Sequence, residues 1–427
     1  MSLRKKLFFS AVAAILFLAA VSGLLKLSEK TGLFSFSRPD DRVIYYPTQP
    51  LLQQTVVDGK RVWRIRHPAM LDADFPFNKP PNLYRVAVVG GSFAMGSPYL
   101  HQAPDYPNQP GSIGHFVVGE LGLRFPSRQV ELVNAAVGAV SSGVVAETAR
   151  EIARMQPDVM LVMTGNNEGY VPFADLNKVL HKWVLYRMLK KAIKPGVAPE
   201  QRSYFAPQDP DTQKIIDNYE KNIRAMVEVG RDFSVPILLC TLPIHRQYEG
   251  PDPGMHGTAL PPTPDDPKLT EGDLLQDQGK YAAALKAYAE SENPVAAVGK
   301  MARCQEILGR YDEALALYDA EVEANPKNRT RPSVNQILRN VASETSTGLV
   351  DLDARYRQNS STGLGNPALF VDYCHMTWRG YQQLAEAIVD QIIGQGMIVG
   401  VAGEPLPRPN LDAVVRAIDG GKLYRLP

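Results

Sequence analysis

The chain has 427 residues, which is long enough for a complete hydrophobic core and for more than one module. Its 44% hydrophobic and 21% charged residues are ordinary for a folded protein, and its formal net charge of +1 offers no overall attraction to nucleic acid. The three cysteines, Cys240, Cys304 and Cys374, allow at most one disulfide, and no cysteine and histidine spacing resembles a zinc site. We therefore expect neither a nucleic-acid partner nor a bound metal.

The N-terminus carries a basic cluster followed by an apolar run. Arg4, Lys5 and Lys6 precede residues 7–25, an uncharged stretch that approaches the length needed to cross a bilayer as a helix. We interpret residues 1–26 as a membrane anchor, with the basic cluster in the cytoplasm and the rest of the chain on the far side. The small residues at 20–22 also fit a cleavage site, so secretion after removal of a signal peptide is the alternative.

Residues 27–80 carry scattered prolines and aromatic residues without sustained periodicity, and we interpret them as a spacer with a small β element at residues 60–66. From Tyr84 onward, strand-like runs alternate with helical patterns. The predicted strands cover residues 84–90, 130–134, 158–164, 235–240 and 349–352, and the predicted helices cover 112–125, 143–155, 212–231 and 377–393. This alternation indicates an α/β fold with three layers, in which helices cover both faces of a mainly parallel five-stranded sheet.

A basic stretch at residues 176–194 combines six lysines and arginines with Trp183, Leu185 and Leu189. A basic amphipathic helix beside a membrane anchor can lie on anionic lipid. The alternative is an ordinary helix with a solvated basic face.

Residues 269–326 interrupt the alternation with a pattern that recurs after about thirty residues. Ala284 and Tyr288 are echoed by Ala314 and Tyr318, each pair after a Gly-Lys-Tyr or Gly-Arg-Tyr turn. This pattern resembles a tetratricopeptide repeat, so residues 251–345 are predicted to be a small α-helical insert. Since two units are too few to stand alone, we expect the insert to pack against the main domain. It is either a site for a protein partner or a plain helical hairpin without a binding function.

Ser92 follows an apolar run, YRVAVVGGSFAMG, that ends at two glycines. A buried strand that enters a tight turn at Gly-Gly would place Ser92 at the carboxyl edge of the sheet, where open α/β sheets bind ligands. The alternative is an ordinary helix cap. A serine nucleophile needs a base and a group that orients the base, and His375 has Asp372 three residues upstream, just before the last predicted helix.

Acyl transfer also needs donors that stabilise an oxyanion. Gly138 follows one predicted strand and Asn167 follows another, so a backbone N–H and a side-chain amide would reach the same sheet edge as Ser92. Because the carboxyl ends of parallel strands meet at one edge, these pieces converge on one site.

The blocks that contain Ser92, Gly138, Asn167 and the pair Asp372 and His375 resemble, in order, those of the SGNH or GDSL-like hydrolase superfamily. The resemblance implies a flavodoxin-like three-layer fold in two parts, 81–250 and 346–395, followed by a tail at 396–427. It also implies a catalytic triad of Ser92, Asp372 and His375 and an oxyanion hole formed by Ser92, Gly138 and Asn167. No nucleotide-binding fingerprint occurs, and we expect no cofactor.

Two positions depart from the family pattern: Gly91 replaces the aspartate of the GDS block, and Glu168 replaces the aspartate of the GxND block. Neither position is nucleophile, base or oxyanion donor, so we expect the chemistry to survive. The combination with an anchor and helical repeats looks like a group of bacterial SGNH proteins. This likeness places the chain in the bacterial inner membrane as a single-pass protein with an extracytoplasmic catalytic domain.

The leading hypothesis is a membrane-tethered serine ester hydrolase that acts on O-acyl groups of an envelope carbohydrate or lipid through an acyl-serine intermediate. An O-acyltransferase would use the same triad. The alternative of another class is a catalytically silent SGNH scaffold whose helical repeats recruit a partner.

Overall fold

The computed structural model describes residues 51–66, 73–99, 111–168, 212–250 and 266–398, together with five helical residues between positions 17 and 24. Most of the predicted anchor at residues 7–25 lies outside the described residues, and so do the whole basic stretch at 176–194 and most of the tail at 396–427. Among the described residues, no helix combines the length and the apolar character that a membrane crossing requires.

The centre of the molecule is a five-stranded sheet in the order β5-β4-β6-β7-β8, and every neighbouring pair of strands is parallel. Its strands are β4 (Leu83–Gly90), β5 (Gln129–Asn134), β6 (Val159–Met163), β7 (Ile237–Cys240) and β8 (Gly348–Val350). All eight residues of β4 and all five of β6 are buried, because the sheet is covered on both faces. The prediction of a parallel five-stranded α/β sheet is confirmed.

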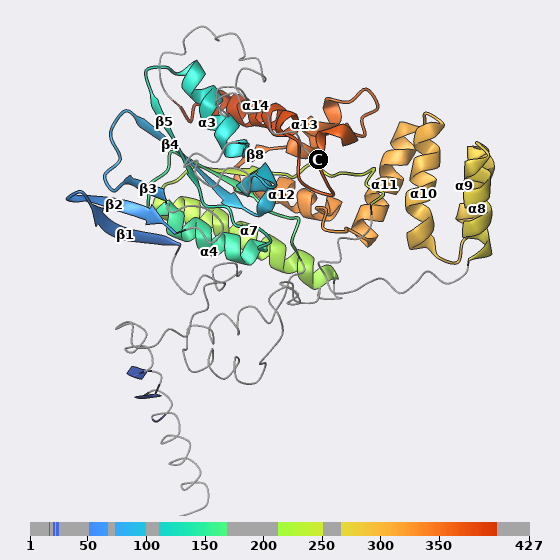
Figure 1. Cartoon of the computed structure of the whole chain (residues 1–427), viewed down its shortest axis with the longest axis horizontal. Helices are drawn as coiled ribbons and strands as arrows, with labels where there is room; N and C mark the ends of the chain where they lie inside the picture. The colour runs from blue at the N-terminus through green and yellow to red at the C-terminus, as the bar shows by residue number, and fades with distance from the viewer. Residues whose placement is uncertain are drawn as a thin grey trace, which may run out of the picture.

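Helices cover the two faces of this sheet (Figure 1). On one face of the sheet, the residues Val86 and Val88 contact α3 (Ile113–Arg124) and α14 (Trp378–Gly394). On the other face, the residues Ala87 and Val89 lie in the core formed with α4 (Ser142–Ala153), α7 (Thr212–Phe233) and α12 (Pro332–Thr345). The short α13 (Leu352–Gln358) packs beside α14. Alternate residues of one strand thus enter opposite cores, which makes three layers.

A second, antiparallel sheet precedes the main one, with strands β1 (Leu52–Val57), β2 (Lys60–Ile65) and β3 (Ala73–Pro76). Trp63 and Ile65 are buried in the core that α4 shares, and Glu151 of α4 accepts a hydrogen bond from the backbone N–H of Leu52 at 3.1 Å. The described part of the predicted spacer, residues 51–66 and 73–80, is therefore more than a spacer, because β1 and β3 join the predicted β element and this sheet packs onto the main domain.

Four helices form an arm between β7 and α12, which Figure 1 shows extending from one end of the sheet. They are α8 (Pro267–Asp277), α9 (Tyr281–Ala289), α10 (Pro294–Ile307) and α11 (Tyr311–Ala324), and consecutive helices pack side by side. The recurring residues Ala284, Tyr288, Ala314 and Tyr318 are all buried within these helices. The predicted boundary at residue 345 is too late, because α12 packs on the main sheet with α7. We call α8–α11 the helical arm.

Candidate active site

Ser92 lies where β4 ends and α2 (Ser92–Met95) begins. Gly90 packs so closely against β6 that a Cβ at this position would overlap with the carbonyl oxygen of Met163, so only glycine fits. The N–H of Gly91 donates a hydrogen bond to the same oxygen at 3.3 Å. The chain then turns into α2 and leaves Ser92 half-buried at the carboxyl edge of the sheet.

Asp372 and His375 lie in a tight turn whose ends, Phe370 and Met376, pair as an antiparallel bridge. One carboxylate oxygen of Asp372 accepts hydrogen bonds from the backbone N–H groups of Cys374, at 2.8 Å, and His375, at 2.7 Å. The other oxygen lies 2.6 Å from Nδ1 of His375. The turn therefore fixes the carboxylate by its own backbone, and the carboxylate fixes the imidazole ring.

The imidazole of His375 joins this turn to Ser92, since its Nε2 lies 2.8 Å from the hydroxyl oxygen. Burial alone would raise the pKa of Asp372, but the hydrogen bond and charge of His375 and two backbone N–H donors outweigh burial and hold that pKa below its ordinary value. An ionised carboxylate only accepts hydrogen bonds, so Nδ1 of His375 carries the proton of that contact. When the ring is neutral, the unprotonated Nε2 faces the hydroxyl of Ser92 and can accept its proton. This is the geometry of a nucleophile, a base and a group that orients the base.

Gly138 and Asn167 both lie beside this serine. A Cβ placed on Gly138 would be 3.9 Å from Cβ of Ser92, and Nδ2 of Asn167 would be 3.0 Å from a Cβ placed on Gly91. One of the two N–H groups of the Asn167 amide donates to the carbonyl oxygen of Val140 at 3.2 Å, which fixes the side chain. The structure therefore brings all five predicted site residues to one edge of the sheet.

Glu168 has a supporting position that sequence reasoning did not assign. Its carboxylate accepts hydrogen bonds from the backbone N–H of Ser142, at 2.8 Å, and from the hydroxyl of the same residue, at 2.7 Å. Ser142 is the first residue of α4, so Glu168 caps that helix. Burial raises the pKa of Glu168 to about 7, although the hydrogen bonds from Ser142 and Thr164 oppose the shift. The residue after Asn167 is thus anchored to α4.

Asn134, at the end of β5, is a second supporting residue that sequence reasoning missed. Its side chain is buried, donates to the carbonyl oxygen of Met95 at 3.2 Å and accepts from the N–H of Ala136 at 3.1 Å. It joins the end of α2 to the segment that leads to Gly138. A polar residue at the end of an apolar strand was the available signal, because buried polar groups need partners.

In the part of the chain that the structure describes, Asp372, Cys374 and His375 are the one group of side chains close enough to share a metal ion. Both ring nitrogens of His375 already have hydrogen-bond partners in Asp372 and Ser92. Burial raises the pKa of the Cys374 thiol well above its ordinary value, so the thiolate that a metal would need is disfavoured. All three cysteines of the chain are free and buried.

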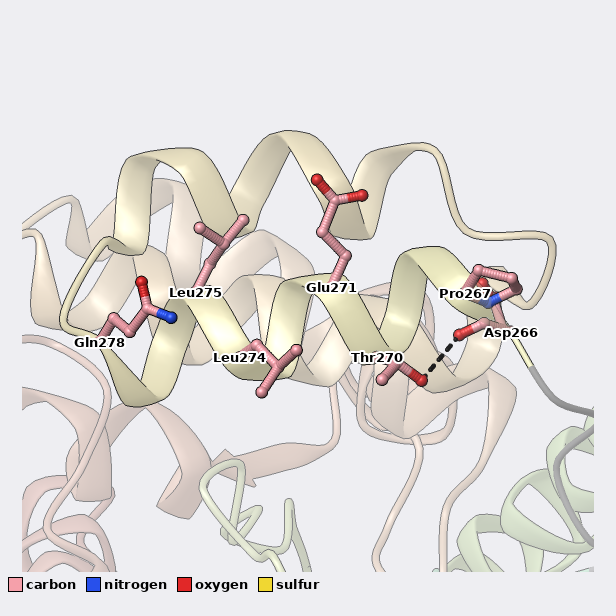
Figure 2. A pocket seen from close by; sticks show the side chains of 7 residues that line it. All are labelled: Asp266, Pro267, Thr270, Glu271, Leu274, Leu275 and Gln278. Carbon is pink, nitrogen blue, oxygen red and sulfur yellow. Dashed lines mark hydrogen bonds between the residues drawn. The ribbon is translucent and has the colours of Figure 1, made fainter.

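A surface pocket of about 540 Å³ lies on α8 of the helical arm and contains none of the site residues (Figure 2). Its lining residues all belong to α8 or flank it: Asp266, Pro267, Thr270, Glu271, Leu274, Leu275 and Gln278. The dashed line in Figure 2 joins the hydroxyl of Thr270 to the backbone oxygen of Asp266. The carboxylate of Asp266 accepts hydrogen bonds from the backbone N–H groups of Lys268 and Leu269 at the start of this helix. This pocket is therefore separate from the chemistry at Ser92.

No protein-family model matches the chain, and no curated protein matches its sequence. Several solved structures are similar in fold. A GDSL-like lipase from Bacteroides thetaiotaomicron has 11% identity and a TM-score of 0.34, over 73% of this chain and 88% of the lipase. An acetyl xylan esterase from Geobacillus stearothermophilus has 15% identity and a TM-score of 0.37, over 74% of this chain and 96% of the esterase. A lipase/acylhydrolase from Enterococcus faecalis has 11% identity and a TM-score of 0.35, over 73% of this chain and 96% of the acylhydrolase. Identities and TM-scores this low say nothing about a substrate.

Proposed function

We propose that the chain is a serine ester hydrolase of SGNH type that works through an acyl-serine intermediate. The observation that carries the proposal is the continuous contact from Ser92 through His375 to Asp372, with distances of 2.8 Å and 2.6 Å. The sequence resemblance to the SGNH blocks supports it independently of the coordinates. A scaffold without activity has no need for a base, its orienting carboxylate and two adjacent amide donors, so the enzyme is favoured over the silent scaffold.

The reaction begins when Oγ of Ser92 attacks an ester carbonyl while Nε2 of His375 accepts the hydroxyl proton. The carboxylate of Asp372 stabilises the imidazolium that forms. The backbone N–H groups of Ser92 and Gly138 and the amide of Asn167 would donate hydrogen bonds to the oxyanion. His375 then gives its proton to the leaving alcohol, which departs from the acyl-serine. In the second half, water attacks the acyl carbonyl and loses its proton to His375. The bond between the acyl carbon and Oγ of Ser92 then breaks, Oγ takes the proton from His375, and the carboxylic acid leaves.

The proposed substrate class is an O-acyl group on an envelope carbohydrate or lipid. This choice rests on the predicted anchor at residues 7–25, which would hold the catalytic domain outside the cytoplasm at a bacterial inner membrane. Secretion after cleavage would keep the same compartment. Transfer of the acyl group to a sugar hydroxyl instead of water needs the same residues, so an O-acyltransferase is the nearest variant of the proposal. The helical arm, with its tetratricopeptide-like pattern, is the proposed site for a protein partner.

The test is hydrolysis of p-nitrophenyl acetate by the purified full-length chain, with Ser92→Ala as the matched control. We expect turnover in the wild type and its loss in the variant. A fluorophosphonate probe should label the wild type but neither Ser92→Ala nor His375→Ala. Equal hydrolysis by the wild type and Ser92→Ala would remove the proposal. Addition of a sugar acceptor distinguishes the hydrolase from the acyltransferase. Formation of an acylated sugar in place of the free acid would favour the acyltransferase.

A further inference from the structure

The loop after β7 lies between the helical arm and the turn that holds Asp372. His245 in this loop donates from Nδ1 to the backbone carbonyl oxygen of Asp372 at 2.9 Å. A carbonyl oxygen only accepts hydrogen bonds, so Nδ1 of His245 carries the proton. Its ring also stacks on Phe370, with ring centroids 4.6 Å apart and planes at 6°. His245 thus contacts the catalytic turn at Phe370, its first residue, and at Asp372, which bears the carboxylate.

The backbone of His245 is held in turn by a buried arginine. The guanidinium of Arg329 donates to the carbonyl oxygen of His245 at 3.3 Å and binds the carboxylate of Glu321, on α11, at 2.6 Å. The side chain of Arg329 is fully buried. A buried charge without its partner is costly, so this ion pair ties the loop firmly to the arm.

Arg246, the residue after His245, is also bound to the helical arm. Arg246, also buried, binds Asp319 of α11 at 2.8 Å and Asp353 of α13 at 2.9 Å. Two acidic residues of α11 therefore hold two consecutive residues of the loop. Glu321 binds Arg329, which donates to the backbone of His245, and Asp319 binds the side chain of Arg246 directly. The loop is fixed between the arm and the main domain at the position from which His245 reaches Asp372.

We propose that His245 is a positioning residue for the catalytic turn, and that the helical arm fixes His245 through the ion pairs of α11. The inference rests on the proposed function, because it concerns how the base is held. The carboxylate of Asp372 is already bound by the turn's own backbone, whereas its carbonyl oxygen is held from outside by His245. Loss of that contact lets the turn shift relative to Ser92. Turnover should fall while substrate binding changes little.

The test compares two variants of His245 in the full-length chain. His245→Phe keeps a flat ring on Phe370 but removes the donor, and His245→Asn keeps an N–H donor at the place of Nδ1. We expect kcat of His245→Phe to fall by about tenfold to a hundredfold with KM within about twofold, and His245→Asn to recover most of the loss. Thermal melting of each variant verifies that it is folded. Equal kcat in His245→Phe and the wild type, or no recovery in His245→Asn, would overturn the role of His245.

A second pair of variants tests the arm. Glu321→Gln removes the charge that holds Arg329 but keeps an acceptor, and Asp273→Asn removes a charge of the arm that pairs with Lys300 instead. We expect kcat of Glu321→Gln to fall by roughly twofold to tenfold, and Asp273→Asn to equal the wild type. A kcat of Glu321→Gln equal to that of Asp273→Asn would overturn the link between the helical arm and the catalytic turn. Absence of any Ser92-dependent hydrolysis in the wild type is a different result, which overturns the proposed function and this inference with it.

Discussion

The hydroxyl oxygen of Ser92 lies 2.8 Å from Nε2 of His375, although the two residues are 283 positions apart in the sequence. The contact follows from the sheet topology. Ser92 begins α2 just after β4 ends, and His375 lies three residues before α14, which packs with α3 on one face of the sheet. Because the whole fold brings these two residues together, substitutions of Ser92 or His375 should lower turnover more than they lower the free energy of unfolding.

Asp372→Asn tests the orientation of the base. An amide at this position can present an N–H to Nδ1 of His375, which favours the tautomer whose Nε2 cannot accept the serine proton. We expect kcat for ester hydrolysis to fall on the order of 10³-fold to 10⁴-fold with little change in KM. The matched control is Asp390→Asn on the exposed surface of α14, where the carboxylate pairs with Arg124, and it should keep wild-type turnover. Equal rates in the two variants would contradict the role of Asp372.

Asn167→Ala tests the oxyanion donor. The side-chain amide lies beside Gly91, next to the nucleophile, and its removal should leave a developing negative charge with one fewer donor. We expect kcat to fall by about a hundredfold or more, with a stable fold. Asn340→Ala is the control, since Asn340 is exposed on α12 and accepts a hydrogen bond from the exposed Gln336. Unchanged turnover in Asn167→Ala would remove the oxyanion assignment.

The sequence predicted the main fold well because its strongest signals are local. Each strand of the sheet is a short apolar run followed by a helical pattern, and the buried residues of β4 and β6 carry the β-branched and apolar character of doubly covered strands. The antiparallel sheet was largely missed, because β1 has three consecutive polar residues, which break the alternation expected of a strand, and β3 is four residues long and ends in proline.

The site residues were predictable as types and spacings, but their supports were not. The Asp372 to His375 spacing is a local signal, and the turn realises it through hydrogen bonds three residues apart. The contacts of His245 with Asp372 and of Glu168 with Ser142 join segments that are 127 and 26 residues apart, and nothing local marks them. The limit of the insert was also hidden, because α12 follows α11 along the chain as one more helix but buries its apolar face on the sheet.

Gly91→Ala tests the close approach between the turn and Asn167. A Cβ at this position would lie 3.0 Å from Nδ2 of Asn167, tighter than an ordinary contact, while the backbone angles of Gly91, φ −88° and ψ −160°, suit alanine. The amide must therefore shift by a few tenths of an ångström. We expect about a tenfold loss of kcat without loss of folding. Gly143→Ala is the control, because the nearest atom to its new Cβ would be 3.6 Å away, and it should keep the wild-type kcat. A kcat of Gly91→Ala equal to that of Gly143→Ala would contradict the crowding at Asn167.

Glu168→Gln tests the ionisation of the carboxyl that caps α4. Its pKa is about 7 in the folded protein and near 4.5 when unfolded, so the folded state holds this proton more tightly. The resulting stabilisation is complete below pH 4.5, declines as the pH rises, and is gone above pH 7. The wild type should therefore lose roughly 3 kcal/mol of its free energy of unfolding across this window through Glu168 alone.

Glutamine keeps the capping contacts, since its oxygen can accept from the N–H of Ser142 and its amide can donate to the hydroxyl. It cannot ionise, so the free energy of unfolding of Glu168→Gln should change less between pH 5 and pH 8 and should exceed that of the wild type at pH 8. Urea unfolding at four pH values across this range measures both slopes. Glu228→Gln on the exposed face of α7 is the matched control and should keep the wild-type slope. A Glu168→Gln slope as steep as the wild type would show that the carboxyl is already ionised at pH 5, because only an ordinary pKa leaves the two curves parallel.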